Sequence, residues 1–214
     1  MRVSALIAGA IVGLFAVSFS HAAHAQAWAS FYGEADRFAL GFPGDPTIEE
    51  IEWLDENAEP RSARRYSAER AGNVYTLIAV NYDDIDEAIY HPAYEHAATV
   101  YREMGEVTFD DHAQTDRIDG HQLQITLPDG RRLYLAAHYH GGRLYILDAN
   151  VSARSAPPGQ FQQNLQIVDN EGVRVRYTQE GERMIRTDDL QDALGGPILE
   201  GPIFEGNTDT PIAQ

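Results

Sequence analysis

The sequence predicts an α+β fold, in which a mainly antiparallel β-sheet carries two packed helices. Two observations lead to this class. Segments in which apolar and polar residues alternate follow one another along the chain, and short turns rich in glycine and proline join them. Only two segments space their apolar residues as a helix does, so the predicted strands outnumber the predicted helices. Most of the strands follow one another as hairpins.

The first half of the chain contains an apolar lead-in over 28–32 and then four predicted strands. The strands cover Phe38–Phe42, Thr47–Trp53, Arg61–Glu69 and Asn73–Tyr82. The turn Pro43–Pro46 ends the first strand, and Ala71-Gly72 joins the last two as a hairpin. The fourth strand is nearly all apolar, which is typical of a central position in a sheet.

A helix is predicted next, beginning at His91-Pro92 and ending at Gly105. Proline suits the first helical turn because its missing N–H would have no helical partner there. The apolar residues of this segment form one stripe at helical spacing, made of Tyr94, Ala97, Ala98, Tyr101 and Met104. We therefore expect this face of the helix to pack on the sheet.

A meander of three strands follows the helix. It is predicted over Gly120–Leu127, Arg131–His140 and Arg143–Val151. A three-residue loop pairs Leu127 with Arg131 and puts the apolar residues of the first two strands on one face. A two-residue loop would divide these residues between the faces, so we expect the three-residue register.

A second helix, a last strand and a tail complete the predicted chain. The helix is predicted over 157–169 and the strand over 173–178. The apolar face of the helix consists of Phe161, Leu165 and Val168. Glycine, proline and acidic residues dominate from Gln179 onward, so a single domain over 26–178 is expected to precede a flexible, disordered tail over 179–214.

The first 25 residues have the pattern of a secretory signal peptide. Arg2 precedes an apolar run over Ala5–Phe19, and the small-residue motif Ala23-His24-Ala25 follows. The run is short for a membrane span, so we expect cleavage after Ala25 or Ala27 and a periplasmic or secreted mature protein. An uncleaved anchor is the alternative interpretation.

Composition limits the possible partners and cofactors. The chain has a formal net charge of −17 and contains no cysteine. Without cysteine it has no disulfide and no thiolate metal site. Its negative field repels nucleic acid and anionic lipid, so we expect neither nucleic-acid binding nor stable membrane insertion after signal cleavage. The same field favours cations or a basic partner, although acidity also serves solubility alone.

The strand histidines His138 and His140 are the candidate metal ligands. Residues i and i+2 of a strand share a face, so two imidazoles could bind one zinc or copper ion or another small ligand. The site needs a third ligand, and His121 lies on the same face only in the two-residue register that we reject. The alternative is that both histidines simply end a strand beside Gly141-Gly142.

The tail contains the candidate partner-binding residues, in a short repeat. Gly196–Glu200 is followed by the similar Gly201–Glu205, and each contains a bulky apolar pair. These pairs are Ile198 with Leu199 and Ile203 with Phe204. A proline before each pair favours an extended backbone, suited to a sheet edge or a groove. Packing of the tail on its own domain is the alternative.

Motifs of known catalytic chemistry are missing from the sequence. There is no Gly-x-Ser-x-Gly elbow, no cysteine nucleophile and no glycine-rich phosphate loop. The chain therefore favours a non-enzymatic binding or accessory module of the cell envelope, acting on an envelope protein. A metal- or small-ligand-binding protein that uses the strand histidines is the first alternative, and a hydrolase without a recognisable motif is the second.

Four motifs give the chain a family resemblance. They are Phe38–Pro46, Leu127–Arg132, Gly142–Leu147 and Phe161–Leu165. Over about 36–169 the chain resembles small exported bacterial proteins with a PsbP-like or Mog1-like α/β/α sandwich. Most members of that group have no known function, and the named relatives are accessory or partner-binding proteins of photosystem assembly or nuclear transport. The resemblance implies that fold and a non-enzymatic binding role, and it implies no catalytic residues.

Overall fold

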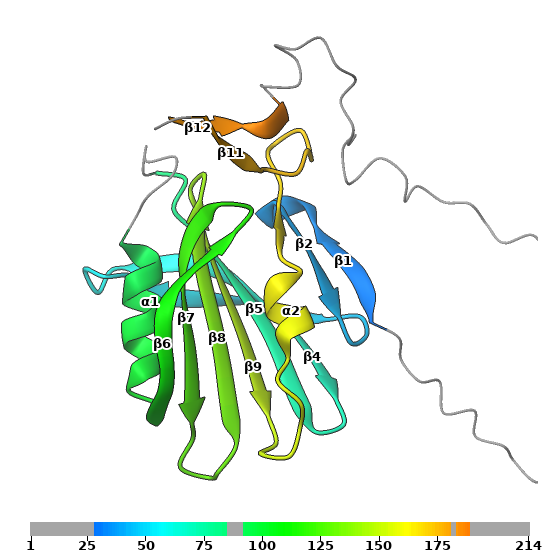
Figure 1. Cartoon of the computed structure of the whole chain (residues 1–214), viewed down its shortest axis with the longest axis vertical. Helices are drawn as coiled ribbons and strands as arrows, with labels where there is room; N and C mark the ends of the chain where they lie inside the picture. The colour runs from blue at the N-terminus through cyan, green and yellow to red at the C-terminus, as the bar shows by residue number, and fades with distance from the viewer. Residues whose placement is uncertain (1–27, 85–91, 181–182, 189–214) are drawn as a thin grey trace, which may run out of the picture.

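A seven-stranded antiparallel sheet forms the centre of the molecule (Figure 1). The computed structural model describes residues 28–84, 92–180 and 183–188. In spatial order the strands are β3 (Thr47–Leu54), β4 (Pro60–Arg70), β5 (Asn73–Asn81), β9 (Arg143–Val151), β8 (Arg132–His140), β7 (Ile118–Thr126) and β6 (Glu106–Thr115). With helices packed on this sheet, the predicted α+β class is confirmed.

Different elements cover the two faces of the main sheet. Helix α1 (Ala93–Arg102) packs on one face. A smaller sheet and a short helix pack on the other, namely β1 (Ala29–Gly33), β2 (Phe38–Phe42), β10 (Gln166–Ile167) and α2 (Gly159–Gln163). The 3₁₀ turn η1 (Glu34–Asp36) joins β1 to β2. The main sheet is thus the middle layer of three.

Each face of the main sheet has its own core, because successive side chains of a strand point to opposite faces. Along β8, Leu133, Leu135, Ala137 and Tyr139 pack in the core under α1. The alternate residues Tyr134 and Ala136 pack in the core under β2 and α2. Strand β8 is therefore buried on both faces, and this explains its almost continuous apolar sequence.

The turn between β7 and β8 has the predicted register. The Leu127 N–H donates to the Arg131 carbonyl oxygen across a three-residue loop, with an N–O distance of 2.9 Å. Leu123 and Leu135 then lie opposite each other under α1. Gly130 takes a positive φ of 81° in this loop, a conformation that a side chain would disfavour. The three-residue prediction is confirmed.

The helix predictions need two corrections. Helix α1 ends at Arg102, so Met104 lies beyond it and is 41% exposed instead of completing the apolar stripe. Helix α2 covers only Gly159–Gln163, whereas 157–169 was predicted. The chain beyond it forms β10, which pairs with β2. The predicted apolar face is nevertheless buried, as Phe161, Leu165 and Val168 show. The prediction was wrong because an irregular segment can bury residues at helical spacing too.

The last described part of the chain is a hairpin. Strands β11 (Tyr177–Glu180) and β12 (Arg183–Arg186) pair with each other, and the Thr187 N–H donates to the Arg176 carbonyl oxygen. The expected last strand, 173–178, thus forms only an isolated bridge at Arg174 and the start of β11. The hairpin crosses the predicted domain boundary at 178. The predicted signal peptide and the rest of the predicted tail lie outside the described residues.

Candidate functional site

A buried polar cluster surrounds the carboxylate of Asp36. This residue ends η1 and is only 4% exposed. Arg64 of β4 donates from Nε and Nη2 to its two carboxylate oxygens, at 2.6 Å each, and the Tyr66 hydroxyl donates to it at 2.5 Å. These bonds raise the pKa of the Arg64 guanidinium, while burial and then the Asp36 carboxylate raise the pKa of the Tyr66 hydroxyl.

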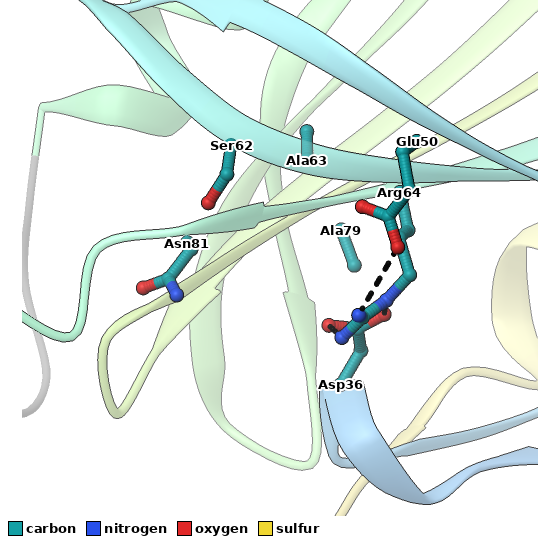
Figure 2. Close-up of a pocket in the computed structure, with 7 residues that line it drawn as sticks. All are labelled: Asp36, Glu50, Ser62, Ala63, Arg64, Ala79 and Asn81. Atoms are coloured by element: carbon teal, nitrogen blue, oxygen red, sulfur yellow. Dashed lines mark hydrogen bonds and ion pairs between the residues drawn. The ribbon is translucent and has the colours of Figure 1, made fainter.

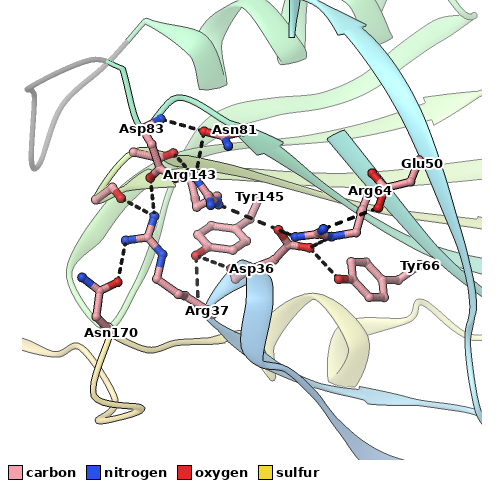
Figure 3. Close-up of polar contacts among 12 residues, drawn as sticks. Asp36, Arg37, Glu50, Arg64, Tyr66, Asn81, Asp83, Arg143, Tyr145 and Asn170 are labelled. Carbon is pink, nitrogen blue, oxygen red and sulfur yellow. Dashed lines mark hydrogen bonds and ion pairs between the residues drawn. The ribbon is translucent and has the colours of Figure 1, made fainter. Parts of the chain in front are cut away.

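A second set of contacts joins this cluster to neighbouring loops (Figure 3). Arg37 has a left-handed backbone with a φ of 58°, and its Nη2 donates to the Gly141 carbonyl oxygen at 2.6 Å and to Asp83 at 3.0 Å. Arg143 of β9 lies 2.7 Å from the other Asp83 oxygen. The Tyr145 hydroxyl lies 3.0 Å from the Asp36 carbonyl oxygen. Asp36 and Arg37 therefore fix the β1–β2 connection to the main sheet.

The outer side of the cluster lines a small cavity of about 60 Å³ (Figure 2). Its lining residues are Asp36, Glu50, Ser62, Ala63, Arg64, Ala79 and Asn81. Small-molecule sites begin at roughly 300 Å³, so this cavity suits a few waters or the end of one side chain. It adjoins an open groove of about 540 Å³, which shares Ser62 and Asn81 with it and continues past Arg61 to Asp84.

The cavity marks a part of the main sheet that the small sheet of β1, β2 and β10 leaves uncovered. Ser62 and Arg64 share a face with Tyr66, because they alternate along β4, and Glu52 and Glu50 lie opposite them on β3. Tyr66 is covered by the small sheet, whereas Ser62, Glu50 and Glu52 are exposed. We call the set Glu50, Glu52, Ser62, Arg64 and Asn81 the polar corner.

The polar corner contains groups with unused hydrogen-bonding capacity. Within the described ranges, neither the Ser62 hydroxyl nor the Glu52 carboxylate has a partner, and the Asn81 amide nitrogen donates no bond. Most of the charges around them are already paired, as Arg64 is with Asp36 and Arg61 with Asp55. The corner can thus recognise polar groups of a partner without rearranging its own ion pairs.

The predicted metal ligands His138 and His140 lie elsewhere, at the end of β8. Burial lowers the pKa of His138 to about 4, and the side chain is only 1% exposed. Burial also lowers the pKa of His140 to about 4, and its Nε2 lies 2.8 Å from the Tyr177 hydroxyl. His121 points to the other face, as expected from the register.

The described part of the chain has no group of three or more His, Asp or Glu side chains placed to hold a metal ion. The zinc or copper site stays a prediction, which calorimetry of the wild type against a His138→Ala/His140→Ala variant would test. The predicted tail residues Ile198, Leu199, Ile203 and Phe204 lie outside the described residues.

Sequence reasoning missed the polar corner and strand β6. Asp36 and Arg64 are 28 residues apart in sequence, and no motif links them. The only local signal was the run of glutamates on β3, which reads equally well as an ordinary solvated face.

Comparison of the chain with protein-family models, with curated proteins and with solved structures finds no match. Among the described helices, none has the length and apolar character that crossing a membrane requires.

Proposed function

We propose that the protein is a non-enzymatic binding module of the cell envelope, and that it holds a protein partner at the polar corner. One observation carries the proposal: exposed polar groups that have no partner among the described residues lie on a face of the main sheet that the small sheet leaves uncovered. They lie next to the edge of β3 with which no described strand pairs. A strand edge offers backbone hydrogen bonds to a partner, and neighbouring side chains supply specificity.

The chemistry of the corner favours recognition over catalysis. The buried carboxylate beside the corner, Asp36, is held by three hydrogen bonds from Arg64 and Tyr66. General acid–base catalysis needs a group within hydrogen-bond reach of the substrate, and these bonds already occupy both carboxylate oxygens of the buried Asp36. The exposed groups, by contrast, are free to bond to a partner.

The envelope location and the family resemblance belong to the same proposal. The signal-peptide pattern of residues 1–25 supports export. Packing of α1 and α2 on opposite faces of the central sheet supports a PsbP-like or Mog1-like sandwich. In this proposal the tail repeat, with Ile198, Leu199, Ile203 and Phe204, provides a second contact with the partner.

Site-specific photo-crosslinking in the exporting cell tests the proposal. A photoreactive amino acid replaces Ser62 in the polar corner or, as a control, Asp129 in the exposed β7–β8 turn. We expect one discrete crosslinked polypeptide from position 62 and none from 129. Equal crosslinking at both positions, or none at 62, would contradict the proposal. Truncation after Asp188 tests the role of the tail. If the shortened chain crosslinks the partner as well as the full chain does, the tail repeat is not part of the binding site.

A further inference from the structure

The free edge of β3 suggests what the polar corner binds. We propose that an extended, basic segment of the partner adds a strand to this edge. The inference rests on the proposed function, since it names the chemistry of the partner at the same site. Four features support it: the geometry of the edge, the state of the opposite edge, the charges of β3 and the neighbouring cavity.

The geometry of β3 suits strand addition. Its pairing with β4 is unbroken from Thr47 opposite Ser67 to Leu54 opposite Pro60. No described residue pairs with its other edge. Natural edge strands are usually protected by prolines, bulges, short length or charged side chains, and the charges of β3 are all negative, which opposes only strands that are not basic. Strand β3 contains no proline and no bulge over its eight residues, so its outer edge can accept a partner strand.

The opposite edge, β6, is protected. Its register shifts between Val107 and Phe109, which marks a bulge that interrupts regular pairing. Asp110 of β6 is held by Arg102 of α1 at 2.6 Å and by His121 of β7 at 2.6 Å. The bulge disfavours an added strand at β6, and the charge of Asp110 is already paired within the chain. The two edges thus differ, and β3 is the accessible one.

The charges of β3 indicate a basic partner. Glu49 and Glu50 pair with arginines of β4 but keep side-chain exposures of 52% and 74%, and Glu52 has no ion partner in the described chain. Side chains on neighbouring strands lie roughly 5 Å apart, so opposite charges there stabilise pairing and like charges oppose it. The exposed Ile48 and Leu54 flank these glutamates. The matching segment therefore has basic residues in its middle and apolar residues at its ends.

This charge pattern argues against other occupants. The tail over 189–214 contains five acidic residues and no basic one, so it would be repelled by the glutamates of β3. A second copy of the chain carries the same net charge of −17 and the same acidic edge. A basic segment of a different protein is the occupant that the electrostatics favour.

The cavity beside Asp36 adds a contact for one long side chain. It opens on the face of β3 that carries Glu50, and its rim includes the exposed Ser62 hydroxyl (Figure 2). Both groups accept hydrogen bonds from an ammonium or guanidinium group. At about 60 Å³ the cavity can take the end of such a side chain.

Three synthetic ten-residue peptides provide the test, with the mature full-length chain. In the first peptide arginine and valine alternate in the middle and valines form the two ends. In the second peptide glutamate replaces arginine. In the third two prolines replace valines in the middle, which keeps the charge but prevents strand pairing. We expect the first to bind at physiological salt and to slow amide hydrogen exchange over 47–54. The glutamate peptide should not bind, and the proline peptide should bind at least about tenfold more weakly.

Matched variants locate the site. Glu52→Arg on β3 should weaken binding of the arginine peptide about tenfold, because it places like charges on adjacent strands. Glu106→Arg makes the same change on the protected edge β6 and should leave binding unchanged. Both residues are exposed, so neither change removes a buried contact.

Several outcomes would overturn strand addition. Equal binding of the arginine and proline peptides would show that charge attracts the peptide without strand pairing. Slower amide hydrogen exchange over 106–115 on peptide binding would place the site at β6 instead. The amides of 47–54 could also be protected from hydrogen exchange when no peptide is present. If truncation after Asp188 removes that protection, the tail is the occupant. If dilution of the protein removes it, a second copy of the chain is the occupant. If peptides fail while position 62 still crosslinks a partner, the proposed function stands and strand addition fails; if both fail, so does the proposed function.

Discussion

Neutralising the buried carboxylate of Asp36 should destabilise the fold more than neutralising an exposed carboxylate. Breaking a buried ion pair from one side costs roughly 3–5 kcal/mol, because the partner charge is left uncompensated. The Arg64 side chain is 30% exposed and lies 3.5 Å from Glu50, so water and Glu50 recover part of that loss. An amide at position 36 also keeps an acceptor for the Tyr66 hydroxyl. We therefore expect Asp36→Asn to lower the free energy of unfolding by about 3 kcal/mol.

Glu49→Gln is the matched control for this prediction. The Glu49–Arg65 pair is short as well, but its side chains are 52% and 44% exposed, and such surface pairs contribute less than about 1 kcal/mol. Denaturant unfolding at pH 7, followed by the fluorescence of the two tryptophans, compares the variants. For a chain of this size, 3 kcal/mol corresponds to a fall in melting temperature of about 6–12 °C. A loss in Asp36→Asn within about 0.5 kcal/mol of the control would refute the reasoning.

Three further predictions concern packing, pH and processing. Gly120→Ala should destabilise the fold by about 3 kcal/mol, since the added Cβ would lie 2.2 Å from the Ala137 carbonyl oxygen. In the same unfolding assay the control Gly159→Ala should be close to neutral, because its added Cβ meets nothing within 4 Å. The pKa of His138 falls to about 4 on folding, so the unfolded chain binds the extra proton between pH 6.5 and 4, and this residue should lower the unfolding free energy by up to about 3 kcal/mol as pH falls through that window. The pKa of His140 also falls to about 4, so a His138→Gln variant should lose about half of the pH slope that the two histidines cause. Mass spectrometry of the exported protein should find a first residue of Gln26 or Trp28, and an intact Met1 would contradict signal cleavage.

The sequence was most informative where apolar residues alternate regularly. The β7–β8 register followed from keeping Leu123 and Leu135 on one face, and the structure has that register. Strand β6 was missed because Glu106–Thr115 is mostly polar and exposed, which leaves no alternation to detect. An edge strand is held mainly by backbone pairing with its neighbour, and a single sequence carries little trace of that.

The polar corner could not be predicted for a different reason. The corner and the adjoining Asp36 come from η1, β3, β4 and β5, and each is a common polar residue in its own segment. Only the path of the chain brings Asp36 to Arg64 and leaves Ser62 uncovered. The acidic character of β3 was visible in the sequence, but whether its outer edge was free depended on the order of strands in the sheet.

The order of strands in the main sheet also has a consequence for how quickly the chain folds. Strands β3 to β5 and strands β6 to β9 are each joined to their spatial neighbours by the chain itself, whereas β5 meets β9 only through contacts such as Leu77 with Leu147. Local hairpins form within microseconds, while distant pairings first require the closure of a long loop. We expect the meander β3–β5 and the meander β6–β9 to form independently. Pairing of β5 with β9 should then come last and set the folding rate.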